Sequence, residues 1–213
     1  METVMGLGRN RSLGETVQRF QTPYQIANFV EEFGFSIPEY FRQDWDLMLE
    51  ESMVDNSEFA ICQNLIYPIL KEVWKSYRSK FLLWTQQYLH CDTTLSGFPE
   101  YILARRSPLG KVVFDKPYFV LVEAKQDNFD AGWGQCLAEM VAAQRLHGEL
   151  QVTIYGIVSN GNLWEFGKLE ADRFTKNRVF YTIQNLEQLF ASVNFIFRQC
   201  ELELDQKIFI SAS

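Results

Sequence analysis

The pattern of hydrophobic and polar positions changes its period along the chain. From about residue 56 to 79, apolar residues recur at helical spacing, which predicts a long helix with one buried face. Pro68 lies inside this helix and predicts a kink, because proline cannot donate the backbone hydrogen bond of a helix interior. Short apolar runs bounded by polar residues follow, and they predict strands over 81–90, 98–105 and 117–125. The last run is apolar on both faces, as is typical of a central strand.

The second half of the chain alternates in a similar way. A helix is predicted over 132–147, and Gly148 ends it. Asn160-Gly161 stands between two strand-like runs, and this dipeptide is a strong signal for a β-hairpin. A strand near 178–183 and a helix near 184–200 follow. The resulting order of helix, three strands, helix, hairpin and helix predicts an α/β domain with a central mixed β-sheet flanked by helices.

The residues before this core are predicted to form a partly helical N-terminal extension, residues 1–55, in front of a domain over 56–213. We expect residues 1–21 to be weakly ordered, because their first part is polar and rich in glycine. A Thr-Pro pair then predicts the start of a helix over 22–33, with threonine as N-cap and proline in the first helical position. A second helix is predicted over 38–53.

Composition narrows the classes to which the chain can belong. Its 213 residues are 47% hydrophobic, which is enough for a packed core. The formal net charge of -7, from 20 Lys and Arg against 27 Asp and Glu, argues against nucleic-acid binding driven by overall charge but leaves room for a local basic face. No apolar run is long enough to span a membrane, and the polar N-terminus predicts a cytoplasmic protein without a signal peptide. The four cysteines are scattered without a CxxC pair, so we expect no zinc site.

Two charged residues end the central strand and carry the candidate chemistry. In the stretch YFVLVEAKQ, residues 118–126, Glu123 and Lys125 follow a run of apolar residues. Residues two apart in a strand face the same side, so these two side chains project together. If this strand pairs antiparallel with the preceding one, a turn near Gly110 places Glu100 opposite Glu123. Two carboxylates there suit Mg²⁺ or Mn²⁺, and a lysine beside them could orient a water for phosphodiester hydrolysis.

The same residues resemble a known family. Pro99-Glu100, followed after a hairpin by Glu123-Ala124-Lys125, resembles the signature of the PD-(D/E)xK nucleases. The order of predicted elements over about residues 56–200 is similar to the core of that restriction-endonuclease-like fold. The resemblance implies that Glu100, Glu123 and the carbonyl of Ala124 hold Mg²⁺ or Mn²⁺ and that Lys125 positions the attacking water. It also implies a metal-dependent nuclease that acts on nucleic acid, with DNA as the expected substrate.

The resemblance extends further along the chain. Glu58 resembles the acidic residue on the first core helix of the family, which implies a role at the metal. Gln135 resembles a glutamine that is frequent on the family's next helix, and it is a candidate catalytic residue. Residues 156–161 are similar to the hairpin that follows this helix in several members. One departure is that the family usually has Asp where this chain has Glu100, and catalytic geometry is sensitive to the added bond length.

Each of these residues also has a plainer interpretation. Glu123 and Lys125 could form a surface salt bridge at a strand end. Glu58 could belong to a capping pair at the start of its helix, and Gln135 could be an ordinary polar helix residue. The sequence Asp205-Gln206-Lys207 also fits the (D/E)xK pattern, and we interpret it as part of a solvated tail.

Two further groups of residues have alternative interpretations. Arg105, Arg106 and Lys111 follow the Glu100 strand, and they could contact phosphates of a nucleic acid or form a solvated loop. Two aromatic pairs are expected in the core rather than as base-stacking platforms: Trp84 with Tyr88, and Trp164 with Phe166.

The sequence therefore favours a metal-dependent nuclease and leaves two alternatives. One is a binding module with the same fold in which Glu100 has impaired catalysis. The other is an unrelated α/β regulatory domain, in which Glu100, Glu123 and Lys125 would not converge. The sequence and strandedness of the substrate stay open, as does the oligomeric state, with a homodimer as one alternative.

Overall fold

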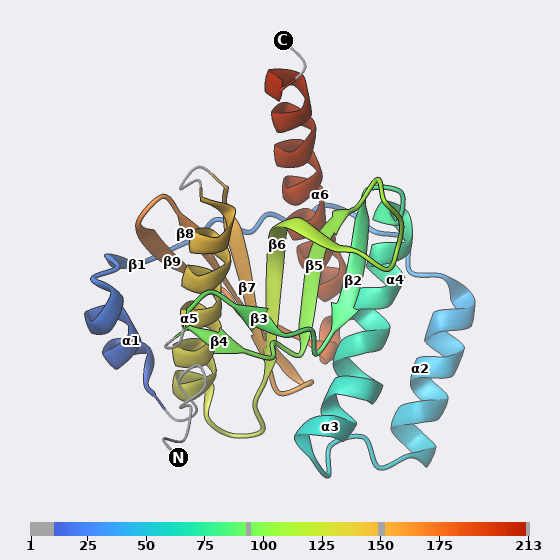
Figure 1. Cartoon of the computed structure of the whole chain (residues 1–213). Coiled ribbons are helices and arrows are strands. Elements are labelled where there is room, and N and C mark those ends of the chain that lie inside the picture. Colours follow the sequence, from blue (N-terminus) through green and yellow to red (C-terminus); the bar gives the residue numbers. More distant parts are fainter. Residues whose placement is uncertain (1–10, 93–94, 149–151, 212–213) are drawn as a thin grey trace.

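A mixed β-sheet forms the centre of the computed structural model, which describes residues 11–92, 95–148 and 152–211 (Figure 1). Within these residues the sheet has eight strands. Their order across the sheet is β2 (Phe81–Thr85), β5 (Tyr101–Arg106), β6 (Phe114–Ala124), β7 (Ile154–Ser159), β8 (Leu163–Glu170), β9 (Arg173–Asn177) and β1 (Tyr24–Ala27), and β10 (Tyr181–Thr182) pairs with β8.

The strand directions explain why the sheet is mixed. Strands β2, β5 and β6 run antiparallel to one another, whereas β6 and β7 run parallel. Parallel neighbours need a crossover connection, and helix α5 (Phe129–His147) supplies it. Strands β7, β8 and β9 are again antiparallel, and β1 joins the edge parallel to β9. The prediction of an α/β domain with a central mixed sheet flanked by helices is therefore confirmed.

Helices cover both faces of the sheet. On one face α5 packs against β6 and β7, and α1 (Leu13–Phe20) packs on α5. A small hairpin made of β3 (Leu89–His90) and β4 (Ser96–Gly97) contacts α5 on the same side. The other face is covered by α2 (Glu39–Glu51), α3 (Glu58–Ile61), α4 (Tyr67–Tyr77) and α6 (Leu186–Ser211). Each face buries its own apolar core. None of the helices in the described ranges is long and apolar enough to cross a bilayer.

The helix predicted over 56–79 is present but interrupted. Helix α3 runs into a π-helical turn over Cys62–Ile66, and α4 begins directly after it. Pro68 lies in the first turn of α4, immediately after this turn. The interruption expected at the proline therefore takes the form of a π-helical turn, a feature that is frequent beside functional sites.

Most of the other predicted core elements are confirmed. Helices α2, α5 and α6 occupy the predicted helical segments, and Asn160-Gly161 forms the turn of the β7–β8 hairpin, with Gly161 at a φ of 86°. The strand predicted over 81–90 is split in two, because Gln86 adopts a φ of 46° and turns the chain away after β2. The strand expected over 178–183 is reduced to β10, and the mostly polar strand β9 before it was not predicted.

Two expectations for the N-terminal segment are wrong. The helix predicted over 22–33 is instead strand β1 followed by irregular chain, because the carbonyls of Pro23 and Ala27 accept hydrogen bonds from the β9 side of the sheet. This long-range pairing outweighs the local helix signal. The segment expected to be weakly ordered contains α1, which a capping box between Ser12 and Glu15 begins. Residues 1–10 of that segment lie outside the described residues.

The segment interpreted as an extension is integrated with the rest of the chain. Strand β1 completes one edge of the sheet. Helix α2 buries Phe41 and Trp45, and the ring of Phe41 lies 5.0 Å from that of Phe190 on α6.

Candidate active site

The register of β5 and β6 brings two glutamates to the same end of the sheet. Tyr101 lies opposite Val122, and the backbone N–H of Glu100 donates to the carbonyl of Val122 at 3.0 Å. Glu100 and Glu123 are therefore the next opposed positions, as the sequence predicted. Gly110, at a φ of 109°, lies in the connecting turn. Two irregularities in the pairing nearer this turn let the register hold at the Glu100 end.

Glu123 is the buried member of the pair. Its side chain is 1% exposed, and its Oε1 has no hydrogen-bond donor among the described residues. The preceding apolar positions of β6 hold the strand in the sheet interior, so the carboxyl at its end cannot move out to water. Ala124 faces the other way, into the core beneath the opposite helices, while its backbone pairs with Ser159 of β7.

A third carboxyl, Glu139, lies against Glu123 and was not predicted from the sequence. It projects from α5, is fully buried, and lies close enough to Glu123 for the two side chains to share a hydrogen bond. The side-chain amide of Gln135, one helical turn earlier, lies 3.5 Å from Glu139 Oε1. The signal was present in the spacing, because Gln135 and Glu139 are four residues apart and share one face of an otherwise largely apolar helix.

Burial makes the charged form of both carboxyls unfavourable. Burial raises the pKa of Glu123 well above its usual range, the neighbouring Glu139 raises it further, and Lys125 opposes the rise. Burial likewise raises the pKa of Glu139 to about 7, against the hydrogen bonds from Glu123 and Gln135, which lower it. The two carboxyls therefore favour holding a proton between them in the metal-free protein.

Lys125 continues from Glu123 along the same edge and leans towards α3. Its Nζ lies 3.8 Å from Glu58 Oε1, and the two side chains are 21% and 46% exposed. The stem of Lys125 crosses Gly132 of α5, where an added Cβ would come within 2.9 Å of its Cγ and 2.8 Å of a Val158 methyl carbon. Gly132 therefore lets the lysine pass close to the helix.

Glu58 is not part of a capping pair with a residue three positions earlier. Ser57 is the N-cap of α3 and accepts from the backbone N–H of Ala60 at 3.1 Å, which makes Glu58 the first helical residue. Its carboxylate is thus left to face Lys125. This places Glu58 at the edge of the cluster, on the side opposite α5.

The Glu100 carboxyl lies between the side of the cluster formed by α5 and the side formed by α3 and the π-helical turn. Gln86 donates to Glu100 Oε2 at 3.2 Å, and the backbone N–H of Gln86 donates to the Glu100 carbonyl at 3.0 Å. Cys62, in the π-helical turn, lies beside it. Burial and then the proximity of Glu100 raise the pKa of the Cys62 thiol to about 12, so this cysteine stays a neutral thiol at physiological pH. We call Glu58, Glu100, Glu123, Lys125, Gln135 and Glu139 the carboxylate cluster.

Three predicted basic residues lie elsewhere. Arg105 and Arg106 are at the far end of β5 from Glu100, and Lys111 lies in the turn beyond it. At about 3.3 Å per residue, the length of β5 separates them from the carboxylate cluster by roughly 17 Å or more. Arg106 donates to the carbonyl of Arg78 at 3.2 Å. The structure does not bring these residues to the carboxylates, and contact with a phosphate stays a prediction.

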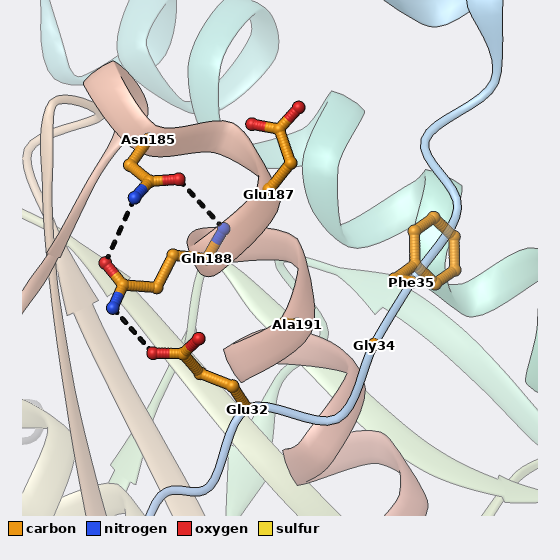
Figure 2. A pocket seen from close by; sticks show the side chains of 7 residues that line it. All are labelled: Glu32, Gly34, Phe35, Asn185, Glu187, Gln188 and Ala191. Atoms are coloured by element: carbon orange, nitrogen blue, oxygen red, sulfur yellow. Dashed lines mark hydrogen bonds between the residues drawn. The ribbon is translucent and has the colours of Figure 1, made fainter.

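Neither the second (D/E)xK sequence nor the surface cavity in Figure 2 is part of the carboxylate cluster. Asp205-Gln206-Lys207 belongs to α6, and Asp205 pairs with Lys80 at 2.7 Å. The cavity in Figure 2 lies between residues 32–35 and the start of α6. The side chains of Asn185, Gln188 and Glu32 bond to one another there, with Gln188 donating to Glu32 at 2.6 Å, and none of the lining residues belongs to the carboxylate cluster.

The cluster offers oxygen ligands but is not closed around one point. Among the described residues, no group of three or more His, Cys, Asp or Glu side chains is placed so that it could hold a metal ion as it stands. However, Glu123 Oε1 and Glu139 Oε2 are buried without a donor. Carboxylate oxygens of this kind are the ligands that Mg²⁺ and Mn²⁺ prefer, so the residue types fit a divalent cation.

Comparisons with known proteins add no family to this geometry. The chain matches no protein-family model. A search of curated proteins found no match either.

Proposed function

We propose that this chain is a metal-dependent nuclease of the restriction-endonuclease-like fold, which hydrolyses phosphodiester bonds in nucleic acid, with DNA as the first substrate to test. The observation that carries the proposal is the position of the cluster. Three carboxyls and a lysine meet where β6 ends, between two apolar cores. Buried carboxyls with unpaired oxygens cost stability, and apolar side chains would pack there at lower cost. A role in binding or catalysis explains why they are present.

Each residue has a distinct task in this proposal. Glu100 and Glu123 would hold Mg²⁺ or Mn²⁺, with the Ala124 carbonyl and Glu58 as further candidate ligands. When bound, the cation supplies charge for the phosphoryl oxygens and lowers the pKa of a bound water. Lys125 orients the attacking water and stabilises the negative charge that develops on the phosphoryl group. Gln135 donates to Glu139, and Glu139 in turn fixes the rotamer of Glu123.

Lys125 gives the cleanest test of catalysis. Lys125→Ala should lower the rate of Mg²⁺-dependent plasmid nicking about 10²–10³-fold, because its interaction develops mainly in the transition state, and should leave DNA affinity nearly unchanged. Lys168→Ala is a matched control, since the Lys168 side chain is 23% exposed, also pairs with a glutamate, and lies on β8 away from the cluster.

The substitution Glu100→Asp separates the nuclease from the binding module. It restores the residue that is usual in the resembling family, so it should raise cleavage if the added methylene has detuned the site. Cleavage by the wild type, Glu100→Asp and Lys125→Ala should be compared on supercoiled, linear and single-stranded DNA, with EDTA as the blank. Equal background activity in all of them would contradict the enzyme proposal, and retained DNA binding would then favour the binding module.

A further inference from the structure

Three exposed rings lie next to one another in and just outside the small β3–β4 hairpin, close in the chain to Glu100. The Tyr88 and His90 rings lie 5.7 Å apart with planes 16° from parallel, and the Tyr88 and Phe98 rings lie 4.8 Å apart at 33°. Tyr88 is 45% exposed and Phe98 58% exposed. We call His90, Tyr88 and Phe98 the aromatic row. The expectation that Tyr88 lies in the core is wrong, whereas Trp164 and Phe166 are fully buried, as expected.

The alternation of the hairpin explains why the row faces outwards. Leu89 is 1% exposed and Leu95 is fully buried, and both belong to the core that α5 covers. Because neighbouring residues of a strand point in opposite directions, burial of Leu89 turns Tyr88 and His90 to the surface. Figure 1 shows the β3–β4 hairpin lying beside α5, the helix that carries Gln135 and Glu139. The row is therefore held on a packed base.

Both ends of the hairpin are tied to Glu100. Phe98 precedes Glu100 by two residues, and Tyr88 follows by two residues the Gln86 side chain that donates to Glu100 at 3.2 Å. Consecutive Cα atoms are about 3.8 Å apart, so the Cα atoms of Phe98 and Tyr88 lie within about 8 Å of the Cα atoms of Glu100 and Gln86, respectively. A ligand whose reacting group lies at the carboxylate cluster can thus extend over the aromatic row.

The chemistry of the row favours flat, partly polar ligands. Stacking on aromatic side chains is how proteins hold unpaired nucleobases, and it tolerates any base sequence. A duplex keeps its base faces stacked inside, where such rings cannot reach them. Binding of a duplex through its phosphates by cationic side chains is less favoured here. The net charge is -7, and Arg105, Arg106 and Lys111 lie towards the other end of β5.

We propose that the aromatic row binds unpaired nucleobases next to the carboxylate cluster, so that the preferred substrate is single-stranded nucleic acid or a single-stranded segment within a duplex. This inference rests on the proposed function and specifies its substrate class. Unpaired bases would pack on the exposed surfaces that Tyr88 and Phe98 leave uncovered, with the scissile phosphate held at Glu100 and Glu123.

The test measures binding without cleavage. Fluorescence anisotropy should give the dissociation constants of a 12-nucleotide oligo-dT, a 12-base-pair duplex and a 12-residue abasic strand, in EDTA and in Ca²⁺. Tyr88→Ala and Phe98→Ala should each weaken oligo-dT binding by about fivefold or more, since loss of one stacked base costs that much. Binding of the duplex and the abasic strand should change less than about twofold, whereas Tyr88→Trp and Phe98→Trp should retain oligo-dT affinity because they keep a stacking face.

A matched control and the cleavage assay make the outcomes separable. Tyr24→Ala removes a ring that is 42% exposed and lies on the far edge strand β1, and it should leave all three affinities unchanged. Equal losses for oligo-dT and the abasic strand, or no loss for either row variant, would overturn the aromatic row. If the Tyr88 and Phe98 variants bind oligo-dT normally and the protein cleaves DNA, the nuclease proposal holds and the base-binding role of the aromatic row is wrong. If the row variants lose oligo-dT binding but no DNA is cleaved, the base-binding role holds and the nuclease proposal is wrong. Absence of binding to every probe would overturn both proposals.

Discussion

At the scale of single residues, the carboxylate cluster contains two carboxyls, Glu123 and Glu139, that are held where water cannot solvate them. The Glu123 side chain is 1% exposed and Glu139 is fully buried, and they share one proton more readily than they carry two charges. Glu72 provides the contrast. It is also buried, but it pairs with Lys75 and accepts from Tyr40, so its charge is compensated. The difference between a compensated and an uncompensated carboxyl should be measurable as a pH dependence of stability.

Glu139→Gln should stabilise the metal-free protein at pH 8. Burial raises the folded-state pKa of Glu139 to about 7, above its value of about 4.3 in the unfolded chain, so its contribution to stability is present below about pH 4 and is lost as the pH rises through 7. Glutamine has no ionisable proton, so the Glu139→Gln protein does not lose stability through this position as the pH rises. Urea unfolding in EDTA should show little difference at pH 4 and a gain of as much as about 4 kcal/mol at pH 8.

The control for this prediction is Glu72→Gln, which removes a compensated charge. It should lower stability or leave it unchanged across the same pH range, because the Lys75 partner is lost. If the stability of Glu139→Gln changes with pH in parallel with that of the wild type, the pKa of Glu139 does not differ between the folded and unfolded states.

At the scale of elements, the packing of α5 on β6 and β7 places Lys125. Gly132 is the contact point, and an added methyl group would meet Val158 at 2.8 Å and Lys125 at 2.9 Å. Gly132→Ala should therefore shift the lysine, cost about 1–3 kcal/mol by overpacking, and reduce cleavage more than its stability loss explains. Gly14→Ala, in helix α1, would meet only Ser12 Oγ at 4.0 Å and should instead stabilise by about 0.5–1 kcal/mol. Thermal unfolding measures the stability of each variant, and cleavage assays below the unfolding transition measure its activity separately. If Gly132→Ala cleaves DNA at the wild-type rate, the added methyl group does not displace Lys125.

The elements also show what local sequence could predict. The register of β5 on β6 followed from one glycine turn and the alternation of two strands. The split of 81–90 could not be predicted, because it depends on Gln86 adopting a positive φ that its bond to Glu100 supports. Strand β1 was predicted as helix, because its hydrogen bonds come from residues 174–178, far away in the sequence. Glu139 was missed for a similar reason, since its role depends on which face of α5 covers Glu123.

At the scale of the whole molecule, the N-terminal segment is part of the fold. Leu13, Val17 and Phe20 pack against the core beneath α5, and β1 covers the edge of β9. Removing residues 1–37 should therefore destabilise the protein by about 3 kcal/mol or more, because several large apolar side chains lose their cover and a strand edge is exposed. Thermal unfolding and light scattering of the truncated chain would test this; an unchanged transition without association would make the segment a dispensable extension.

The most direct test of the central claim is a crystal soaked in Mn²⁺ and measured at an anomalous wavelength. Glu100 and Glu123 are proposed to bind one divalent cation at the end of β6. An anomalous peak is expected within about 2.5 Å of oxygens from both carboxylates, with the Lys125 ammonium on the same side. The peak should vanish in Glu123→Gln crystals grown and soaked identically. A wild-type crystal with both carboxylates ordered and no peak between them would contradict the metal site and the nuclease proposal that rests on it.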